Sequence, residues 1–278
     1  MTTPASGPRF TIGVSLKMYF THARTIAWAT ELAALAQRHP AVQRGVVELF
    51  AVPTFPSLVP VREALAGGPV RLGAQDVATD DDGAFTGEVS AVELAEIGVS
   101  LAEIGHAERR RLYAEDDAMV AAKTAAALRN GVTPLLCVGE LEQAPAPVSA
   151  LEVADQVDAA LAAARSAGTT GPLLVAYEPV WAIGAPVPAP ADHIAAVVAA
   201  LEAHLAEQPD LRGSRVIYGG SAGPGLLTAL GGTVAGLFLG RFAHDVAAVE
   251  QILDEALALA DADADAVTDL ASATGAAS

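Results

Sequence analysis

Eight short apolar segments recur along the chain, and helix-like segments lie between them. The apolar segments are typical of buried strands and cover residues 10–16, 46–52, 70–74, 99–104, 133–138, 173–177, 215–218 and 236–239. In the helix-like segments, Ala and Leu or Val recur at three- and four-residue spacing, at residues 25–37, 116–129, 150–164, 191–206 and 246–259. This alternation predicts a parallel sheet with right-handed crossovers.

The number of strand segments decides between the two common arrangements of such a chain. Eight strands in 278 residues match a closed (β/α)8 barrel, which takes ~250 residues. An open doubly wound sheet is less favoured, and no Gly-x-Gly-x-x-Gly sequence follows the first strand. We therefore predict the α/β class and a single (β/α)8 barrel, the catalytic domain, over residues 9–260.

The two ends of the chain are predicted to lie outside this barrel. Residues 1–8 are interpreted as a flexible N-terminus. Residues 261–278 begin with alternating Asp and Ala and offer too little apolar surface to offset the entropy of ordering them, so we predict a disordered tail. The Pro- and Ala-rich stretch 143–148 is interpreted as a loop inside the domain.

Composition excludes several classes of partner. The chain has 16 basic and 33 acidic residues and a formal charge of −17, which repels nucleic acid and anionic membranes, so an anionic substrate needs local donors. No signal-peptide pattern or run of ~18 uninterrupted apolar residues is present, so no membrane association is expected. The single cysteine, Cys137, excludes an internal disulfide and fits a reducing compartment, so a cytoplasmic location is expected.

The residues that follow the predicted strands define a candidate site, because in a barrel the carboxyl ends of all strands meet on one face. Lys17 follows the first strand, His106 follows the fourth, and Glu178 ends the sixth, directly before a proline that stops regular pairing. Glycine-rich turns, at residues 219–220 and 240, close the last two strands. Each charged residue alone has an ordinary structural explanation. Together they describe a site that moves protons on a small anion.

Four segments, in order along the chain, resemble one family. Residues 83–88 read Gly-Ala-Phe-Thr-Gly-Glu, residues 104–110 read Ile-Gly-His-Ala-Glu-Arg-Arg, residues 176–184 read Ala-Tyr-Glu-Pro-Val-Trp-Ala-Ile-Gly, and residues 218–221 read Tyr-Gly-Gly-Ser. They are similar to the dimer loop, the catalytic histidine segment, the catalytic glutamate with the start of its lid, and the phosphate cradle of the triosephosphate isomerases. The resemblance extends over residues 13–245.

The resemblance implies a division of catalytic labour. Glu178 is the base that moves a proton between neighbouring carbons, and His106 polarises the carbonyl as a neutral imidazole at a helix N-terminus. Lys17 stabilises the developing enediolate and the phosphate by its charge, and Glu108 holds Lys17 in place. An enediolate mechanism needs only a base, an electrophile and a closed site, so neither a metal nor an organic cofactor is implied.

The resemblance also implies binding residues and a partner. The substrate is a small phosphorylated sugar. Its phosphate is expected to meet the backbone N–H groups of Gly184, Ser221, Gly240 and Arg241, and Ser15 is expected near the reacting oxygens. Thr86 lies at the tip of an arm predicted to reach into a second copy of the chain, which predicts a homodimer.

Several residues depart from the family pattern and leave the substrate open. Ser15 stands in place of an asparagine, Leu16 of an aromatic residue, and Arg241 of a glycine, while residues 185–190 place three prolines in the lid. The motifs favour interconversion of dihydroxyacetone phosphate and D-glyceraldehyde 3-phosphate, as in glycolysis and gluconeogenesis. The alternative is a tetrulose phosphate of the erythrulose type, in polyol catabolism. A barrel that binds phosphometabolites without catalysis is the remote third interpretation.

Overall fold

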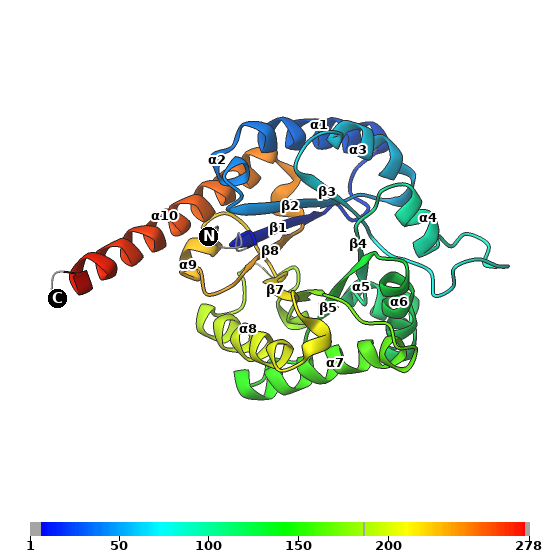
Figure 1. The fold of residues 1–278 in the computed structure, drawn as a ribbon. Helices are drawn as coiled ribbons and strands as arrows, with labels where there is room; N and C mark the ends of the chain where they lie inside the picture. Colours follow the sequence, from blue (N-terminus) through cyan, green and yellow to red (C-terminus); the bar gives the residue numbers. More distant parts are fainter. Residues whose placement is uncertain (1–6, 186, 276–278) are drawn as a thin grey trace.

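The structure is a computed structural model that describes residues 7–185 and 187–275. Eight parallel strands close into a barrel in chain order, and helices surround it (Figure 1). The strands are β1 Phe10–Ser15, β2 Val47–Val52, β3 Val70–Ala74, β4 Leu101–Ile104, β5 Thr133–Val138, β6 Leu174–Tyr177, β7 Arg215–Tyr218 and β8 Gly236–Leu239. The predicted (β/α)8 barrel is confirmed.

Helices follow the strands along the barrel. They are α1 His22–Arg38, α2 Pro40–Gln43, α3 Leu58–Leu65, α4 Ala91–Glu96, α5 Ala107–Tyr113, α6 Asp117–Arg129, α7 Ala146–Ser166, α8 Ala191–Ala206, α9 Leu226–Ala229 and α10 Val246–Gly275. Helix α7 begins inside the stretch that we predicted as a loop. Proline is tolerated in the first turn of a helix because the N–H that it lacks has no partner there. In the described part of the chain, no helix is long and apolar enough to cross a membrane.

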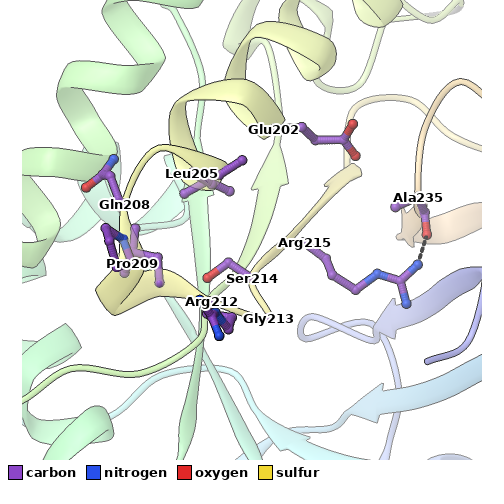
Figure 2. Close-up of a pocket in the computed structure, with 11 residues that line it drawn as sticks. Glu202, Leu205, Gln208, Pro209, Arg212, Gly213, Ser214, Arg215 and Ala235 are labelled. Carbon is purple, nitrogen blue, oxygen red and sulfur yellow. Dashed lines mark hydrogen bonds between the residues drawn. The ribbon is translucent and has the colours of Figure 1, made fainter. Parts of the chain in front are cut away.

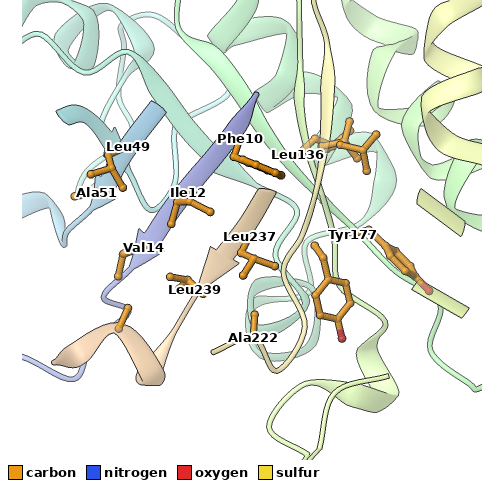
Figure 3. Close-up of a cluster of buried hydrophobic side chains, with 14 of the residues drawn as sticks. Phe10, Ile12, Val14, Leu49, Ala51, Leu136, Tyr177, Ala222, Leu237 and Leu239 are labelled. Carbon is orange, nitrogen blue, oxygen red and sulfur yellow. The ribbon is translucent and has the colours of Figure 1, made fainter. Parts of the chain in front are cut away.

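Alternating residues of the strands divide the core into two layers. One set fills the barrel interior: Phe50, Val52, Leu101, Leu135, Cys137, Leu174, Ala176, Ile217 and Phe238. The residues between them pack in a larger cluster that includes the helices, as Ile12 and Val14 of β1 do beside Leu237 and Leu239 of β8 (Figure 3). A Cβ at Gly236 would lie 1.8 Å from Thr11 O, so glycine allows β8 to approach β1 and close the barrel.

A disordered tail was predicted for residues 261–278, whereas in the structure helix α10 continues to Gly275 and projects from the barrel (Figure 1). The alternating alanines have high helix propensity, and charge pairs hold the helix where it leaves the barrel. Arg44 Nη2 lies 2.6 Å from Asp261 Oδ1, and Arg9 pairs with Asp263. Residues 276–278 lie outside the described residues. So do residues 1–6 of the predicted flexible N-terminus.

A buried charge cluster joins the end of β3 to helices α5 and α6. Lys123 Nζ lies 2.7 Å from Asp76 Oδ1 and 2.6 Å from Glu115 Oε1. Arg109 closes the cluster, with Nη2 2.7 Å from Asp76 Oδ2 and Nε 2.7 Å from Glu115 Oε1. Burial opposes ionisation and raises the pKa of Asp76, although Lys123 counteracts it. The cluster fixes the position of α5, whose N-cap is His106.

Candidate active site

The structure brings Lys17, His106 and Glu178 together at the carboxyl ends of β1, β4 and β6. His106 Nε2 lies 3.3 Å from Glu178 Oε2 and 3.3 Å from Lys17 Nζ. All three residues line one cavity of about 270 Å³. Glu178 and His106 are almost fully buried, with 4% and 5% of their surface exposed. A carboxylate, an imidazole and an ammonium group therefore converge on one small space.

Hydrogen bonding assigns the proton of His106. The backbone N–H of Glu108, in the first turn of α5, donates to His106 Nδ1 at 3.1 Å. In a neutral imidazole that accepts through Nδ1, the proton lies on Nε2, the nitrogen that faces Glu178 and Lys17. Burial, and then the charge of Lys17, lower the pKa of His106 to about 4. The imidazole is therefore neutral at physiological pH and can donate a hydrogen bond from Nε2.

Glu178 has the environment of a base whose charge is opposed by burial. Removal from water raises the pKa of its carboxyl to about 8, although the charge of Lys17 lowers it. A Cβ at Gly219 would lie 2.5 Å from Glu178 Oε1, so glycine after β7 leaves room for the carboxylate. Cys137 Sγ lies 4.0 Å from the same oxygen, and burial raises the pKa of this thiol well above its usual range. Cys137 therefore contributes an apolar wall.

Lys17 is held in a strained conformation by several contacts. Its φ of 47° lies in the left-handed region, which costs free energy in a residue other than glycine. Gln75, just after β3, donates to Lys17 O at 3.0 Å, and Lys17 Nζ donates to Glu108 Oε1 at 2.9 Å. Burial lowers the pKa of Lys17, but Glu178 and Glu108 outweigh it, and the pKa lies above its ordinary value. The group therefore stays charged.

Ser15 differs from the other predicted substrate-binding residues in its position relative to the cavity. It is buried at the end of β1 and does not line the cavity, but its Oγ donates to Glu103 Oε2 at 2.9 Å. Glu103 belongs to β4, and its Oε1 lies 3.9 Å from His106 Nε2. Burial raises the pKa of Glu103 to about 7. Glu103 and Gln75 were not predicted as site residues from the sequence. A charged residue within the apolar segment 99–104 was the signal for Glu103.

A set of backbone N–H donors, which we call the cradle, also lines the cavity. The four residues predicted to bind the phosphate all line this cavity: Gly184, Ser221, Gly240 and Arg241. In the described part of the chain, the backbone N–H groups of these four residues donate to no protein acceptor. Arg241 begins a turn of 3₁₀ helix, Arg241–His244, whose first N–H groups are free by geometry. This set of unpaired donors suits an anion.

The segment after Glu178 is tied down at both ends. Trp181 Nε1 and Tyr177 OH both donate to the buried Glu140 Oε1, at 2.9 and 3.1 Å. Ser221 Oγ, whose single hydrogen can be donated to either acceptor, lies 3.1 Å from Ala182 O and 3.0 Å from Ala185 O. The N–H of Ala189 donates to Tyr218 OH at 3.3 Å. These bonds hold the segment over the cavity. Pro186, one of its three prolines, lies outside the described residues.

A larger cavity, of about 410 Å³, lies at the opposite end of the barrel (Figure 2). It is bordered by the start of β7 and the residue before β8, and Arg215 donates there to the backbone carbonyls of Pro8, Arg9 and Ala235. Barrel enzymes carry their chemistry at the carboxyl ends of the strands. Arg215 therefore has a structural role, and the smaller cavity is the candidate active site.

Thr86 does not lie at this cavity. It belongs to the loop between β3 and α4, in which residues 80–88 are exposed and which projects from the barrel (Figure 1). Arg129 and Asn130 of the α6 end bind Asp81 at the base of the loop. The loop is thus anchored near its base, while its tip, with Phe85 and Thr86, faces outward.

Comparison with known proteins agrees with this geometry. The family model described as triosephosphate isomerase matches residues 10–256. A protein of Pectobacterium atrosepticum named L-erythrulose-1-phosphate isomerase is 51% identical over 91% of this chain and 98% of its own length. A triosephosphate isomerase of Mycobacteroides abscessus is 43% identical over 63% of this chain and 69% of its own length.

A solved structure shows the same relationship. The crystal structure of triosephosphate isomerase from Bartonella henselae superposes with a TM-score of 0.73 at 29% sequence identity, and the match covers 89% of this chain and 98% of that one. The family model covers far more than half of the chain, and the relatives described above are named as isomerases. The protein is therefore an isomerase and belongs to the triosephosphate isomerase family.

Proposed function

We propose that the protein isomerises a tetrulose phosphate, L-erythrulose 1-phosphate, through an enediolate. The observation that carries the chemistry is the convergence of Lys17, His106 and Glu178 beside a cradle of unpaired N–H groups. The relative of that name supports the choice of substrate, because it shares 51% identity over nearly its whole length. The sequence motifs favoured the triose reaction, and the comparisons favour the alternative instead.

The two substrates differ in one substituent of the carbon that loses its proton. In both, a phosphorylated CH2 group adjoins a carbonyl, and the carbon on the other side of the carbonyl carries a hydroxyl and a hydrogen. A triose has a second hydrogen on that carbon, whereas the tetrulose has a hydroxymethyl group. The same base and phosphate site can therefore serve both. Transfer of a proton from C3 to C2, together with transfer of the O3 hydroxyl proton to O2, moves the carbonyl from C2 to C3.

Each side chain has one task in this proposal. Glu178 takes the proton from C3 and returns it to C2. His106 donates from Nε2 to the carbonyl oxygen as negative charge develops there, and the ammonium of Lys17 stabilises that charge. Glu108 and Gln75 position Lys17 through the hydrogen bonds described above. Ser15 and Glu103 lie behind His106, where Ser15 holds the Glu103 carboxyl near the imidazole.

The phosphate lies, in this proposal, on the N–H groups of Gly184, Ser221, Gly240 and Arg241. Unpaired donors at the start of a helical turn bind an anion without a buried counter-charge, which suits a chain of charge −17. The segment over the cavity excludes water. Exclusion of water strengthens each electrostatic contact in the site and protects the enediolate from side reactions.

The activity is expected to rise with pH toward about 8. Glu178 must be ionised to act as a base, and burial raises its pKa to about 8. His106, with a pKa of about 4, stays neutral throughout this range. The pH profile of kcat/KM tests this expectation, because it reports groups of the free enzyme. A profile that rises only near pH ~6, where a phosphomonoester ionises, would assign the rise to ionisation of the substrate phosphate. It would contradict the expectation that burial raises the pKa of the catalytic Glu178.

The choice of substrate is tested by kcat/KM of the purified protein on L-erythrulose 1-phosphate and on dihydroxyacetone phosphate. We expect the tetrulose phosphate to have the higher value. A higher value for the triose phosphate would restore the first interpretation. Binding of both compounds without turnover of either would support a non-catalytic barrel.

We further propose that the protein is a homodimer. Large apolar side chains are exposed on three segments at the carboxyl ends of the strands, where a monomer has no reason to keep them. Met18 is 90% exposed beside Lys17, Phe85 is 48% exposed at the loop tip beside Thr86, and Tyr113 is 66% exposed at the end of α5. A second copy that received the loop would cover such residues.

The change Phe85→Asp is expected to convert the dimer to a monomer, because it places a charge in an apolar contact. Sedimentation at micromolar concentration measures the result. Leu151→Asp is the matched control, since Leu151 is 71% exposed on α7, away from the proposed contact. A wild-type protein that sediments as a fully active monomer would contradict the proposal.

A further inference from the structure

Two arginines that adjoin one aromatic cluster beside the active-site cavity, Arg24 and Arg241, have no carboxylate partner in the described part of the chain. Paired arginines are Arg9, Arg38, Arg44, Arg71, Arg109, Arg110, Arg129 and Arg165. Within the described residues, the guanidinium groups of Arg24 and Arg241 form neither an ion pair nor a hydrogen bond. Arg62, Arg111, Arg212 and Arg215 also form no ion pair in this part of the chain, so Arg24 and Arg241 are distinguished by their shared position at one aromatic cluster beside the active-site cavity.

The two arginines lie around a single aromatic cluster. Arg24, near the start of α1, stacks on the ring of Phe20, with Cζ 3.9 Å from the ring centre. The ring of Phe20 is 4.6 Å from that of His244, and His244 ends the turn that Arg241 begins. Tyr19 also contacts His244, at 5.1 Å between ring centres. The cluster thus connects α1 to the turn after β8.

The electrostatics of His244 show that both guanidiniums act on the same place. Burial, then the charge of Arg24, then that of Arg241, lower the pKa of His244. Its Nε2 is buried and has no hydrogen-bond partner in the described part of the chain. The imidazole is therefore neutral at physiological pH. The positive potential at this point comes from the two arginines.

This cluster borders the phosphate end of the cavity. Tyr19, Arg241 and Phe242 line the cavity, and Arg241 also contributes a backbone N–H to the cradle. Arg24 does not line the cavity, and its side chain is exposed. The guanidinium of Arg24 therefore lies outside the cavity, where an anion in solution can contact it.

We propose that Arg24 and Arg241 form an encounter site for a phosphomonoester dianion, which captures the substrate's phosphate at the mouth before the cradle binds it. The identity of the sugar rests on the proposed function, but the encounter site requires only the phosphate. The overall charge of −17 repels such an anion, and a local pair of cations reverses the field at the one place where it must enter. Arg24 adds attraction without occupying the site.

The charge of Arg24 is the variable to change. Arg24→Met keeps a long apolar stem on Phe20 and removes the cation, whereas Arg24→Lys keeps the charge. Arg212→Met is the matched control: Arg212 is exposed and lies at the cavity at the opposite end of the barrel. For each protein, we would measure kcat, kcat/KM and the inhibition constant of inorganic phosphate, at low and at high salt.

We expect Arg24→Met to lower kcat/KM and weaken phosphate inhibition roughly two- to tenfold at low salt, with kcat unchanged. The difference should disappear at high salt, because the Debye length shortens to ~3 Å at 1 M. Arg24→Lys should retain most of the effect, and Arg212→Met should match the wild type.

Either of two results would overturn the inference. In the first, Arg24→Met matches the wild type at low salt. In the second, Arg24→Met and Arg24→Lys both have a lower kcat/KM and the decrease persists at high salt, which would assign the effect to packing on Phe20. Inorganic phosphate carries no sugar, so its inhibition constant tests the encounter site even if the tetrulose phosphate proves not to be the substrate. Turnover of the two sugar phosphates by the wild type tests the proposed function separately.

Discussion

Replacement of Glu178 by glutamine is expected to lower kcat by ~10²–10⁴-fold, because it removes the proposed proton acceptor from a site that keeps its shape. His106 Nε2 lies 3.3 Å from the Glu178 carboxylate, and no other carboxylate lies as near to it in the described part of the chain. Steady-state turnover of the tetrulose and triose phosphates measures the effect. Turnover near the wild-type value would refute Glu178 as the base.

The same variant should gain stability relative to the wild type as pH rises. Burial raises the pKa of Glu178 from an ordinary 4.5 to about 8. Between these values the unfolded chain has lost the proton that the folded protein keeps, so the wild type loses stability as pH rises through this window. Glutamine does not ionise. Thermal unfolding at pH ~5 and pH ~9 should therefore show a larger advantage for Glu178→Gln at the higher pH.

Lys123→Met is expected to destabilise the protein by ~3–5 kcal/mol, the largest stability effect that we predict. Lys123 and its partners Asp76 and Glu115 have side chains that are 4%, 5% and 2% exposed. Without the ammonium, two buried carboxylates share only Arg109. Calorimetry at matched protein concentration should show a thermal midpoint lower by roughly 6–20 °C.

Arg38→Met is the control for loss of a cation. Arg38 pairs with Glu250 at 2.9 Å, but its side chain is 60% exposed, so water replaces the partner at little cost. Its thermal midpoint should stay close to that of the wild type. Equal shifts of the thermal midpoint for Arg38→Met and Lys123→Met would contradict the view that burial makes loss of the Lys123 cation destabilising.

Strand positions were predictable because each strand is a short apolar segment bounded by polar or glycine-rich turns. The predicted segment 133–138 matches β5, and the predicted helix 191–206 matches α8. Lys17, His106 and Glu178 were predictable for a related reason, since closure of the barrel brings the carboxyl ends of distant strands together. Four family motifs in order then defined the chemistry.

Other features depend on partners far away in the chain. Gln75 contacts Lys17 across 58 residues, and Lys123 contacts Asp76 across 47, so local sequence gives no sign of either pair. The prediction of a disordered tail weighed apolar burial and gave no weight to the helix propensity of alanine or to the pairing of Arg44 with Asp261. The choice between the two substrates was open for another reason. The two substrates share all reacting atoms, so the catalytic motifs do not distinguish them.

Proton NMR of L-erythrulose 1-phosphate with the wild-type protein in D2O tests the central claim most directly. The account predicts that the C3 proton signal disappears and that deuterium enters at the former carbonyl carbon as the carbonyl moves from C2 to C3. Glu178→Gln should show neither change on the same time scale. An unchanged tetrulose phosphate, in a sample whose enzyme exchanges dihydroxyacetone phosphate, would contradict it.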